Sequence, residues 1–324
     1  MRVAVVGGNG NIGRSIVEHL VHAGHEVICF NRGLSGPVPD GTKVIRGDRH
    51  ERADFEQVMA KQAADAAIDL VCFSAEDAQS SLRAFRAVGH FICCSSVATY
   101  GRELESLPAT EDHPLRPSNA YGCGKRDADA AFMAAHQRDG FPMTLVKPAI
   151  TYGPEMGLVR QLGHDLSWLD RIRKGKPLIV ADDGTAVHQF LHIDDAGRFF
   201  AQIVGRAACI GEIYNLVPHG CTRWNDYHRT AMSILGREVE LVRIETAELR
   251  SLVATGRAHA TDIFSHNSFF SAAKRERDVP EFEPNISLEA GMARVIEALD
   301  RAGRIPDSDS ISWEDDVIAA QRGI

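Results

Sequence analysis

The sequence predicts a doubly wound α/β fold, in which helices cover both faces of a parallel β-sheet, followed by a smaller C-terminal lobe. Most of the expected strands read as continuous apolar runs, such as "RVAVV" and "HFICC", rather than as alternating patterns. Continuous runs are typical of strands that are buried on both faces of a sheet. Each run is followed by a segment with helical periodicity, and such alternation of strand and helix is typical of a parallel sheet.

The elements of the sheet follow one another from the N-terminus. After the first apolar run, apolar residues recur at helical spacing from Ile12 to Leu20, and Gly24 ends that helix. Further strands are expected at 25–30, 43–49, 66–74, 90–96 and 143–150, with helices at 55–62, 75–88 and 124–140.

The pattern changes after Gly153. A helix is expected at 158–175, a short strand and turn at 176–184, strand and helix at 188–205, and strands at 212–218 and 238–244. We therefore expect a dinucleotide-binding domain formed by 1–152 and continued by about 187–218, and a smaller substrate-binding lobe formed by 153–186 and 219–324.

Composition and charge argue against a nucleic-acid-binding protein. The chain has 324 residues with 44% apolar and 25% charged residues, which is ordinary for a soluble globular enzyme. Its 36 basic and 44 acidic residues give a net charge of −8. This balance argues against a sequence-independent nucleic-acid binder, which needs a basic face for phosphates. Accordingly, no nucleic-acid partner is expected.

The cysteines and the apolar runs bear on metal binding and on location. The seven cysteines show no C-x-x-C or other ligand spacing, and several lie in apolar runs, so we expect buried reduced thiols and no metal site. No apolar run approaches the roughly 18 residues of a membrane span. The chain also begins directly with a strand, without a basic and then apolar leader. We therefore expect a cytoplasmic protein that does not bind membranes.

A glycine-rich turn follows the first strand. The turn reads "GGNGNIG", with Gly7, Gly10 and Gly13 at regular spacing and Asn11 and Ile12 at the start of the helix. Glycines there permit a tight turn, close approach of the backbone to a pyrophosphate, and close packing of strand and helix. The N-terminus of the helix then faces the phosphate charge. Because the turn lies between a strand and a helix, it predicts a dinucleotide site.

The end of the second strand indicates which dinucleotide is preferred. An acidic residue about 20 positions after the glycines would bind the ribose 2′-hydroxyl of NAD, but here Asn31 and Arg32 stand at that place. A guanidinium pairs well with a 2′-phosphate, so we predict NADP in preference to NAD. The alternative is that Arg32 is a solvated loop residue without a role in binding. Asp48, after the third strand, is either a contact to the adenine or a turn residue.

A serine and a Y-x-x-x-K pattern follow the fifth expected strand. Ser96 lies at the carboxyl end of that strand, where open α/β sheets bind ligands. Tyr121 and Lys125 are one helical turn apart, so they project to the same side. A nearby ammonium, together with the cationic ring of an oxidised nicotinamide, would lower the phenol pKa from about 10 and make it a base near neutrality. Ser96 would hydrogen-bond the same substrate oxygen.

These pieces resemble the extended short-chain dehydrogenases/reductases, also called the NAD-dependent epimerase/dehydratase family. The matching stretches are "GGNGNIG", "SSVATYG", "YGCGK", "KPAITYGP" and "HQFLHIDDA", in the right order over about residues 1–200, and the chain looks most similar to an atypical branch with "NRG" after the second strand. That branch includes chloroplast proteins that bind stem-loop RNA. The resemblance implies Ser96, Tyr121 and Lys125 as the catalytic triad, with Tyr121, Lys125 and Pro148 also contacting the cofactor.

Departures from the family pattern limit the substrate prediction. Family dehydratases usually carry Asp-Glu after the catalytic hydroxyl, whereas Val97 and Ala98 follow Ser96 here, which disfavours dehydration. Ile150 stands where an asparagine often contacts substrate, and His188 where sugar-nucleotide enzymes often carry arginine. These five residues are the predicted substrate contacts. The expected substrate is small and sugar-like, and a free sugar, sugar acid, lactone or other small carbonyl compound remains open beside a sugar nucleotide.

Two enzyme functions and one function of another class remain. The resemblance implies a nicotinamide-dependent epimerase or oxidoreductase. An epimerase of this kind is an isomerase that removes a hydride from a carbinol carbon and returns it to the other face of the ketone. An NADPH-dependent reductase of a small carbonyl compound is the alternative. A dinucleotide-sensing or RNA-binding regulator is the third, but such sensors can dispense with the tyrosine and lysine that this chain carries. The resemblance also suggests a homodimer formed through the helix of Tyr121 and Lys125.

Overall fold

The computed structural model describes residues 1–254 and 261–323. The chain divides into two compact units, which are described separately below. Unit 1 comprises Met1–Thr151, Ile193–Pro218 and Phe270–Asn285, and unit 2 comprises Tyr152–His192, His219–Phe269 and Ile286–Ile324. The return of 270–285 to unit 1 is not part of the domain division that the sequence predicts.

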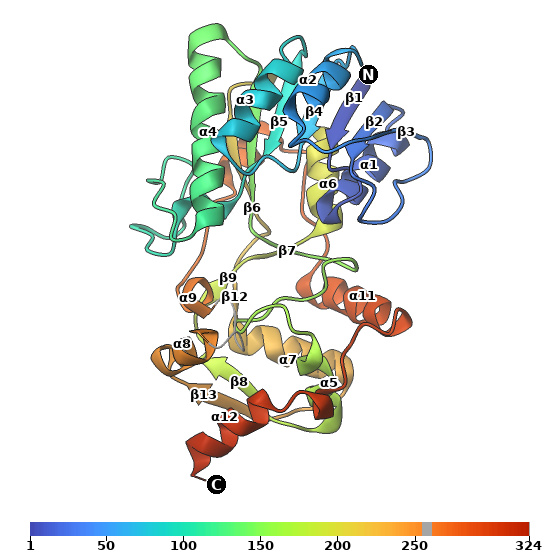
Figure 1. Cartoon of the computed structure of the whole chain (residues 1–324). Helices are drawn as coiled ribbons and strands as arrows, with labels where there is room; N and C mark the ends of the chain where they lie inside the picture. Colours follow the sequence, from blue (N-terminus) through green and yellow to red (C-terminus); the bar gives the residue numbers. More distant parts are fainter. Residues whose placement is uncertain (255–260, 324) are drawn as a thin grey trace. The chain divides into compact units, whose positions relative to one another are not determined.

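A parallel β-sheet forms the centre of unit 1 (Figure 1). Within the described residues it has seven strands in the order β11-β6-β5-β4-β1-β2-β3. Val3 of β1 pairs with Val27 of β2 on one side and with Ala66 of β4 on the other, and the remaining neighbours are parallel as well. The strands are β1 (Arg2–Val6), β2 (Glu26–Asn31), β3 (Thr42–Arg46), β4 (Ala66–Asp69), β5 (His90–Cys94), β6 (Met143–Pro148) and β11 (Ile213–Leu216). The predicted doubly wound fold is confirmed.

Helices cover both faces of this sheet. Helices α1 and α6 pack against each other on one face, and α2, α3 and α4 lie in a row on the other (Figure 1). On the second face, Phe55, Phe85, Phe91 and Phe132 form a chain of aromatic contacts that fills the core. The helical elements are α1 (Asn11–His22), α2 (Arg52–Ala60), α3 (Ala75–Ala84), η1 (Val97–Tyr100), α4 (Ala120–Asp139), α6 (Ile193–Gln202), η2 (Ala207–Cys209) and α10 (Ala273–Asp278).

Unit 2 is built around a cluster of aromatic side chains. Trp224 contacts Phe190 and Tyr227 at ring-centroid distances of 5.2 and 5.4 Å, and Trp168 contacts Tyr227 at 6.0 Å. The elements are α5 (Ser167–Lys174), β8 (Leu178–Ala181), β9 (Val187–His188), β10 (Phe190–His192), β12 (Thr222–Arg223), α7 (Trp224–Leu235), β13 (Leu241–Ile244), α8 (Thr246–Ala254), α9 (Thr261–Phe264), α11 (Leu288–Arg301), η3 (Ser308–Ser310) and α12 (Trp313–Arg322), and β7 (Ile150–Tyr152) crosses the boundary of the two units.

The helix expected at 158–175 is shorter in the structure. Only Ser167–Lys174 is helical, and the prediction is wrong for the residues before it. Gly163 has a φ of 115°, outside the helical region, and its N–H exchanges backbone hydrogen bonds with Arg160. The guanidinium of Arg160 is buried and makes two hydrogen bonds to Glu314 at 2.7 and 3.0 Å. This distant ion pair fixes the segment in a non-helical conformation that local periodicity does not reveal.

The Arg160–Glu314 pair leads to a stability prediction. Replacing Arg160 by Met leaves a buried carboxylate with less compensation, so we expect Arg160→Met to lower the free energy of unfolding of unit 2 by about 3 kcal/mol. In Arg160→Met/Glu314→Leu both charges are removed, and we expect most of that loss to be recovered. Denaturant unfolding followed by the fluorescence of the buried tryptophans measures both. A double variant that is less stable than the single one would contradict this account.

Candidate active site

The glycine-rich turn after β1 has the geometry of a phosphate cradle. Gly7 has a φ of 87°, which L side chains rarely adopt, and its N–H donates to the carbonyl of Phe30. A Cβ on Gly13 would lie 2.3 Å from the carbonyl oxygen of Gly7, so a side chain there is excluded. Helix α1 begins at Asn11, directly after the turn. The first N–H groups of a helix have no acceptor within it, and here those of Asn11 and Ile12 are the predicted phosphate donors.

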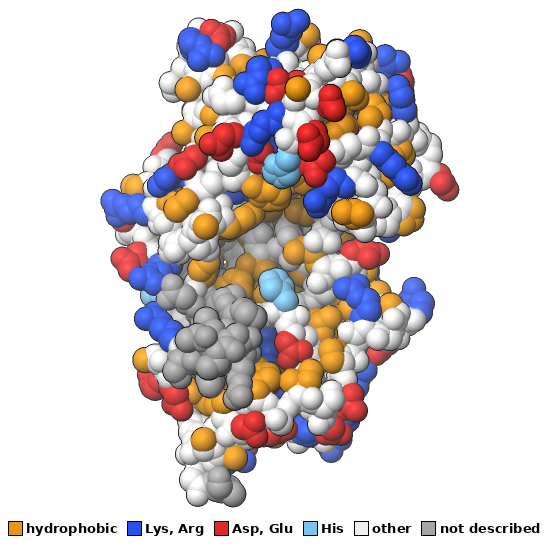
Figure 2. All heavy atoms as spheres, in the orientation of Figure 1, with side chains coloured by type: hydrophobic (Ala, Val, Ile, Leu, Met, Phe, Trp, Pro, Cys, Tyr) orange, Lys and Arg blue, Asp and Glu red, His pale blue; other side chains and the backbone are white. Residues whose placement is uncertain are grey.

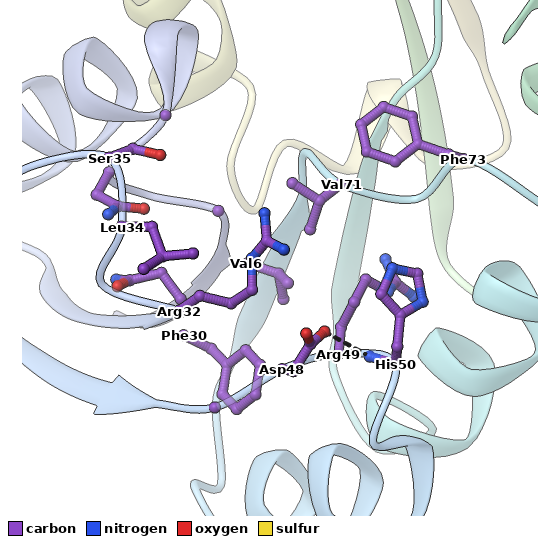
Figure 3. Close-up of a pocket in the computed structure, with 15 residues that line it drawn as sticks. Val6, Phe30, Arg32, Leu34, Ser35, Asp48, Arg49, His50, Val71 and Phe73 are labelled. Atoms are coloured by element: carbon purple, nitrogen blue, oxygen red, sulfur yellow. Dashed lines mark hydrogen bonds between the residues drawn. The ribbon is translucent and has the colours of Figure 1, made fainter.

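A pocket lies beside this turn, at the carboxyl ends of the strands (Figure 3). It is built entirely within unit 1 and receives residues from the first β–α turn and from the segments after β2, β3 and β4. The lining residues are Val6, Gly7, Asn9, Gly10, Phe30, Asn31, Arg32, Leu34, Ser35, Gly47, Asp48, Arg49, His50, Val71 and Phe73. Five of the predicted cofactor residues, Gly7, Gly10, Asn31, Arg32 and Asp48, are therefore gathered around one cavity.

Asn31 contributes a buried polar atom without a partner to this pocket. The residue is 6% exposed, and its Oδ1 accepts a hydrogen bond of 2.9 Å from the backbone N–H of Gly33. Its Nδ2 is buried and makes no hydrogen bond. A buried donor that is left unsatisfied costs free energy. A ligand with an acceptor oxygen in the pocket would satisfy it, so this observation fits a bound nucleotide.

Arg32 and Asp48 reach the pocket from the ends of two adjacent strands, β2 and β3. In Figure 3 the side chain of Arg32 extends over the cavity, while Asp48 lies on the β3 side and His50 beside it. Oδ1 of Asp48 accepts a hydrogen bond of 2.9 Å from the backbone N–H of His50, which is the geometry of a turn residue. Both alternatives for Asp48 are thus compatible with its position, because the turn keeps its carboxylate at the rim.

A buried charge network, which the sequence does not reveal, supports the floor of the pocket. Arg49 donates two hydrogen bonds of 2.9 and 3.1 Å to the carboxylate of Asp69 and a third, of 2.8 Å, to the carbonyl of Asp77. Asp69 in turn accepts from the backbone N–H of Val71, and Asp77 from that of Phe73. The network therefore fixes the backbone that follows β4, where two of the pocket residues stand.

Ser96, Tyr121 and Lys125 come together at the end of β5. Ser96 caps the short helix η1, where its Oγ accepts a hydrogen bond of 3.1 Å from the N–H of Ala98. Nζ of Lys125 donates to the carbonyl oxygen of Cys94 at 2.6 Å. The hydroxyl of Ser96 lies close enough to the phenol of Tyr121 to lower its pKa, and Tyr121 is 48% exposed. The structure thus brings together the three residues predicted to be catalytic.

Two glycines allow helix α4 to approach this closely. A Cβ on Gly122 would lie 2.6 Å from the carbonyl oxygen of Ala98, and one on Gly124 would lie 2.1 Å from that of Phe73. The side chain of Asn119 starts the helix by accepting a hydrogen bond from the N–H of Gly122. Tyr121 therefore stands in a capped first turn that is pressed against its neighbours.

The pKa values of the pair follow from its surroundings. Burial raises the pKa of Tyr121 above its ordinary value, and this effect outweighs the lowering by the Lys125 ammonium and by the hydrogen bond with Ser96. The lowered pKa expected from the sequence applies to the complex with an oxidised nicotinamide, whose positive charge would add to that of Lys125. Burial lowers the pKa of Lys125, but the acidic groups of Cys94, Cys93 and Tyr121 outweigh it and raise that pKa. Lys125 is therefore an ammonium ion at neutral pH.

Phe73 links the pocket to this trio and is missed by sequence reasoning. Its ring is 46% exposed, lines the pocket, and lies 4.4 Å from Nζ of Lys125 and 6.2 Å from the ring of Tyr121. An aromatic face attracts an ammonium, so the ring helps to hold Lys125 in place. A lone phenylalanine after an apolar run gives no sequence signal for this role.

The other predicted site residues have varied environments. Val97 and Ala98 are half-buried in η1, Pro148 is buried at the end of β6, and Ile150 is half-buried in β7. His188 belongs to unit 2.

His188 is 1% exposed, and its Nε2 is hydrogen-bonded to the carbonyl of Phe264. Burial lowers its pKa to about 4. Its ring contacts Trp224 and Phe264 in the aromatic cluster. These contacts are those of a core residue, and they do not support the prediction that His188 binds substrate.

The family model described as "NAD dependent epimerase/dehydratase family" matches residues 3–216 of the chain. The chain belongs to this family. It is an NAD(P)-dependent enzyme of the extended short-chain dehydrogenase/reductase type, as the sequence motifs predict. The nicotinamide dinucleotide that this family implies fits the glycine cradle and the unsatisfied Nδ2 of Asn31.

Several curated relatives extend over most of the chain. The 2′-dehydrokanamycin reductase of Streptomyces kanamyceticus is 29% identical over 95% of this chain and 87% of that protein. The chloroplast stem-loop binding protein of 41 kDa b of Arabidopsis thaliana is 22% identical over 90% of this chain and 77% of that protein. The UDP-glucose 4-epimerase of Corynebacterium glutamicum is 30% identical over 61% of this chain and 69% of that protein.

Solved structures share the fold. The UDP-glucose 4-epimerase of Thermotoga maritima, solved with UDP-glucose, superimposes with a TM-score of 0.74 at 20% identity, over 93% of this chain and 99% of that one. The UDP-glucuronic acid 4-epimerase of Bacillus cereus, solved with its substrate and NAD, gives 0.74 at 19% identity, over 93% and 100%.

Residues 1–254 and 261–323 contain neither a candidate metal site nor a candidate membrane span. There, no three or more His, Cys, Asp and Glu side chains are grouped in a way that could hold a metal ion. No helix in this part of the chain is both long and apolar enough to span a membrane.

Gly10 and Gly13 of the glycine-rich turn should respond differently to substitution. In Gly13→Ala the new Cβ meets a backbone oxygen at 2.3 Å, whereas in Gly10→Ala it meets the same oxygen at 3.3 Å. We expect Gly13→Ala to lower the free energy of unfolding by about 2 kcal/mol or more and to abolish dinucleotide binding. Gly10→Ala should fold with little loss of stability. Denaturant unfolding and titration with NADP and NAD measure both effects, and equal stability of the two variants would refute the packing argument.

Proposed function

We propose that this chain is a nicotinamide-dependent oxidoreductase that transfers a hydride at a sugar carbon, interconverting a hydroxyl group and a ketone. The observation that carries the proposal is the meeting of Ser96, Tyr121 and Lys125 at the end of β5, next to the pocket that contains the glycine cradle. The kind of substrate is suggested by the relatives, whose names include UDP-glucose 4-epimerase and 2′-dehydrokanamycin reductase. Both names refer to sugars.

In this proposal each member of the trio has one task. A bound nicotinamide dinucleotide would accept the hydride in one direction and supply it in the other. Tyr121 takes the hydroxyl proton of the substrate during oxidation and returns it during reduction. The ammonium of Lys125 stabilises the phenolate that forms in the oxidative direction. The hydroxyl of Ser96 hydrogen-bonds the substrate oxygen, where negative charge develops.

Two reactions share this half-step, and different observations favour each. The "SSVATYG" stretch, with Ser96, Val97 and Ala98 at the site, and the 30% identity to the UDP-glucose 4-epimerase of Corynebacterium glutamicum favour epimerisation. The reductase relative covers 95% of this chain, which favours an NADPH-dependent reductase of a sugar ketone. An epimerase retains its cofactor, whereas a reductase must exchange it. Release of bound dinucleotide by denaturation, followed by titration of the apo form, therefore separates them.

We also propose that NADP is preferred over NAD, through Asn31 and Arg32. The Nδ2 of Asn31 is an unsatisfied donor in the pocket, and the exposed Arg32 extends over it (Figure 3). Both groups suit an anionic 2′-phosphate better than a ribose hydroxyl. Some neighbours were solved with NAD, but their low identity to this chain supports the fold alone, so they do not decide between NAD and NADP here.

The remaining parts of the proposal concern the lobe and the partners. Unit 2 contains the smaller lobe that we propose to be substrate-binding, and we propose that the molecule works as a cytoplasmic homodimer. An RNA-binding role, suggested by the chloroplast relative, is disfavoured by the net charge of −8. On the face shown in Figure 2, basic and acidic side chains are interspersed, as opposed to being gathered into one basic stripe.

Tyr121→Phe tests the catalytic proposal. It removes the proton-transferring hydroxyl while keeping the ring that packs on Phe73, so we expect dinucleotide affinity within about twofold of the parent and turnover lower by at least about 100-fold. In the parent, kcat/KM for oxidation of the hydroxyl should rise about tenfold per pH unit below the pKa of Tyr121, because the free base is required. Steady-state assays with UDP-sugars and aminoglycoside ketones provide these values. Unchanged turnover in Tyr121→Phe would exclude the assigned mechanism.

Arg32→Ala tests the cofactor preference. If the guanidinium pairs with a 2′-phosphate, its loss should weaken NADP by about tenfold or more and leave NAD within about twofold. Arg46→Ala, which removes another arginine of the same edge, serves as a matched charge control. Calorimetric titration of both variants with both cofactors measures the effect. Equal losses for NADP and NAD would show that Arg32 does not read the phosphate.

A further inference from the structure

One face of helix α4 contacts three successive residues at the end of β5. Tyr121, Lys125 and Asp129 recur at intervals of four residues along the helix, and they meet Ser96, Cys94 and Ser95, respectively. The first two contacts belong to the proposed catalytic trio. The third, between Oγ of Ser95 and Oδ2 of Asp129 at 2.7 Å, has no role in the chemistry proposed above.

Asp129 is also paired with a buried lysine from β6. Nζ of Lys147 lies 2.8 Å from Oδ2 of Asp129 and 2.7 Å from Oγ1 of Thr99 in η1, and the lysine is 1% exposed. Its ammonium also lies 4.9 Å from the ring of Tyr100. The pair thus joins β6, α4 and η1 beneath the site.

The direction of the hydrogen bonds is fixed by the lysine. An ammonium only donates, so the hydroxyl oxygen of Thr99 accepts from Lys147 and its proton must point elsewhere. That proton is donated to the carbonyl oxygen of Ser96 at 2.9 Å. The chain Lys147, Thr99, Ser96 therefore anchors the backbone of the serine whose hydroxyl contacts Tyr121.

Stability alone does not account for this network. Burying an ion pair usually costs as much free energy as it returns, and an apolar pair of similar volume often stabilises a protein at least as well. A buried pair of this kind can instead fix one arrangement of the groups bonded to it. Here those groups are Ser95 and, through Thr99, Ser96.

We propose that Asp129, Lys147 and Thr99 are positioning residues that hold the hydroxyl of Ser96 against the phenol of Tyr121. The proposal rests on the function proposed above, in which that hydroxyl and that phenol act on one substrate oxygen. None of the three residues touches the substrate in this proposal. They act through the backbone of Ser96 and the side chain of Ser95.

Thr99 offers the sharpest test, because it can be changed without altering charge. Thr99→Val keeps the shape and removes the link from Lys147 to Ser96, whereas Thr99→Ser keeps the hydroxyl. The readout is the ionisation of Tyr121, since the hydrogen bond from Ser96 lowers that pKa. Fluorotyrosine, whose phenol ionises at lower pH than that of tyrosine, is incorporated so that the titration ends while the protein is folded. The fluorine resonance of residue 121 is assigned by its absence in Tyr121→Phe.

We expect Thr99→Val to raise the pKa of Tyr121 by about one pKa unit, the value of a typical hydrogen bond, and Thr99→Ser to leave it unchanged. NADP affinity, measured in parallel, should stay within about twofold in both variants. An unchanged pKa in Thr99→Val, or the same shift in both variants, would overturn the proposal.

A second pair of variants separates positioning from stability. Lys147→Met leaves Asp129 buried without its partner and should be strongly destabilised, whereas Asp129→Asn/Lys147→Met removes both charges and should recover much of that loss. The recovered double variant should still show the raised pKa of Tyr121, because Thr99 has lost its anchor. A double variant with the parental pKa would show that the network is purely structural. This titration needs no substrate, so it can fail independently of the proposed reaction, which Tyr121→Phe tests.

Discussion

The close approach of helix α4 to the end of β5 is the constraint on which the site depends. The helix carries glycine at 122 and 124, and a side chain at either place would collide with a backbone carbonyl of a neighbouring loop. The residues that flank these glycines, Tyr121 before them and Lys125 after them, can therefore reach the end of β5. Because Tyr121 and Lys125 are part of this contact, the spacing that gives the Y-x-x-x-K pattern also sets the distance between the phenol, the ammonium and the serine.

The pocket beside the glycine-rich turn and the trio are connected through the segment that follows β4. Arg49, Asp69 and Asp77 hold its backbone from below, and Phe73 at its end faces both the pocket and Lys125. A single short loop thus contributes to both parts of the site. Its shape is set by buried charges at 49, 69 and 77, which come from three different segments of the chain.

Features that depend on local pattern could be predicted from the sequence. The parallel sheet, the glycine turn and the meeting of Ser96 with Tyr121 follow from apolar runs, turn chemistry and helical spacing. Features that depend on distant partners could not. Arg160 breaks a helical pattern because Glu314 pairs with it 154 residues later.

The same limit applies within the site. Asp129 and Lys147 are 18 residues apart, and nothing in the sequence shows that the fold buries them as a pair.

The return of residues 270–285 to unit 1 affects when the core of this unit can be completed during synthesis. Phe270 stacks on Tyr100 at 5.4 Å, and Phe282 meets Phe199 at 4.9 Å, so the sheet unit is completed by residues from late in the chain. During synthesis the strands leave the ribosome long before these two rings do, and apolar surface that they cover stays open meanwhile. Such long sequence separation slows folding. The sheet unit therefore completes its core only after residues 270–285 have been synthesised.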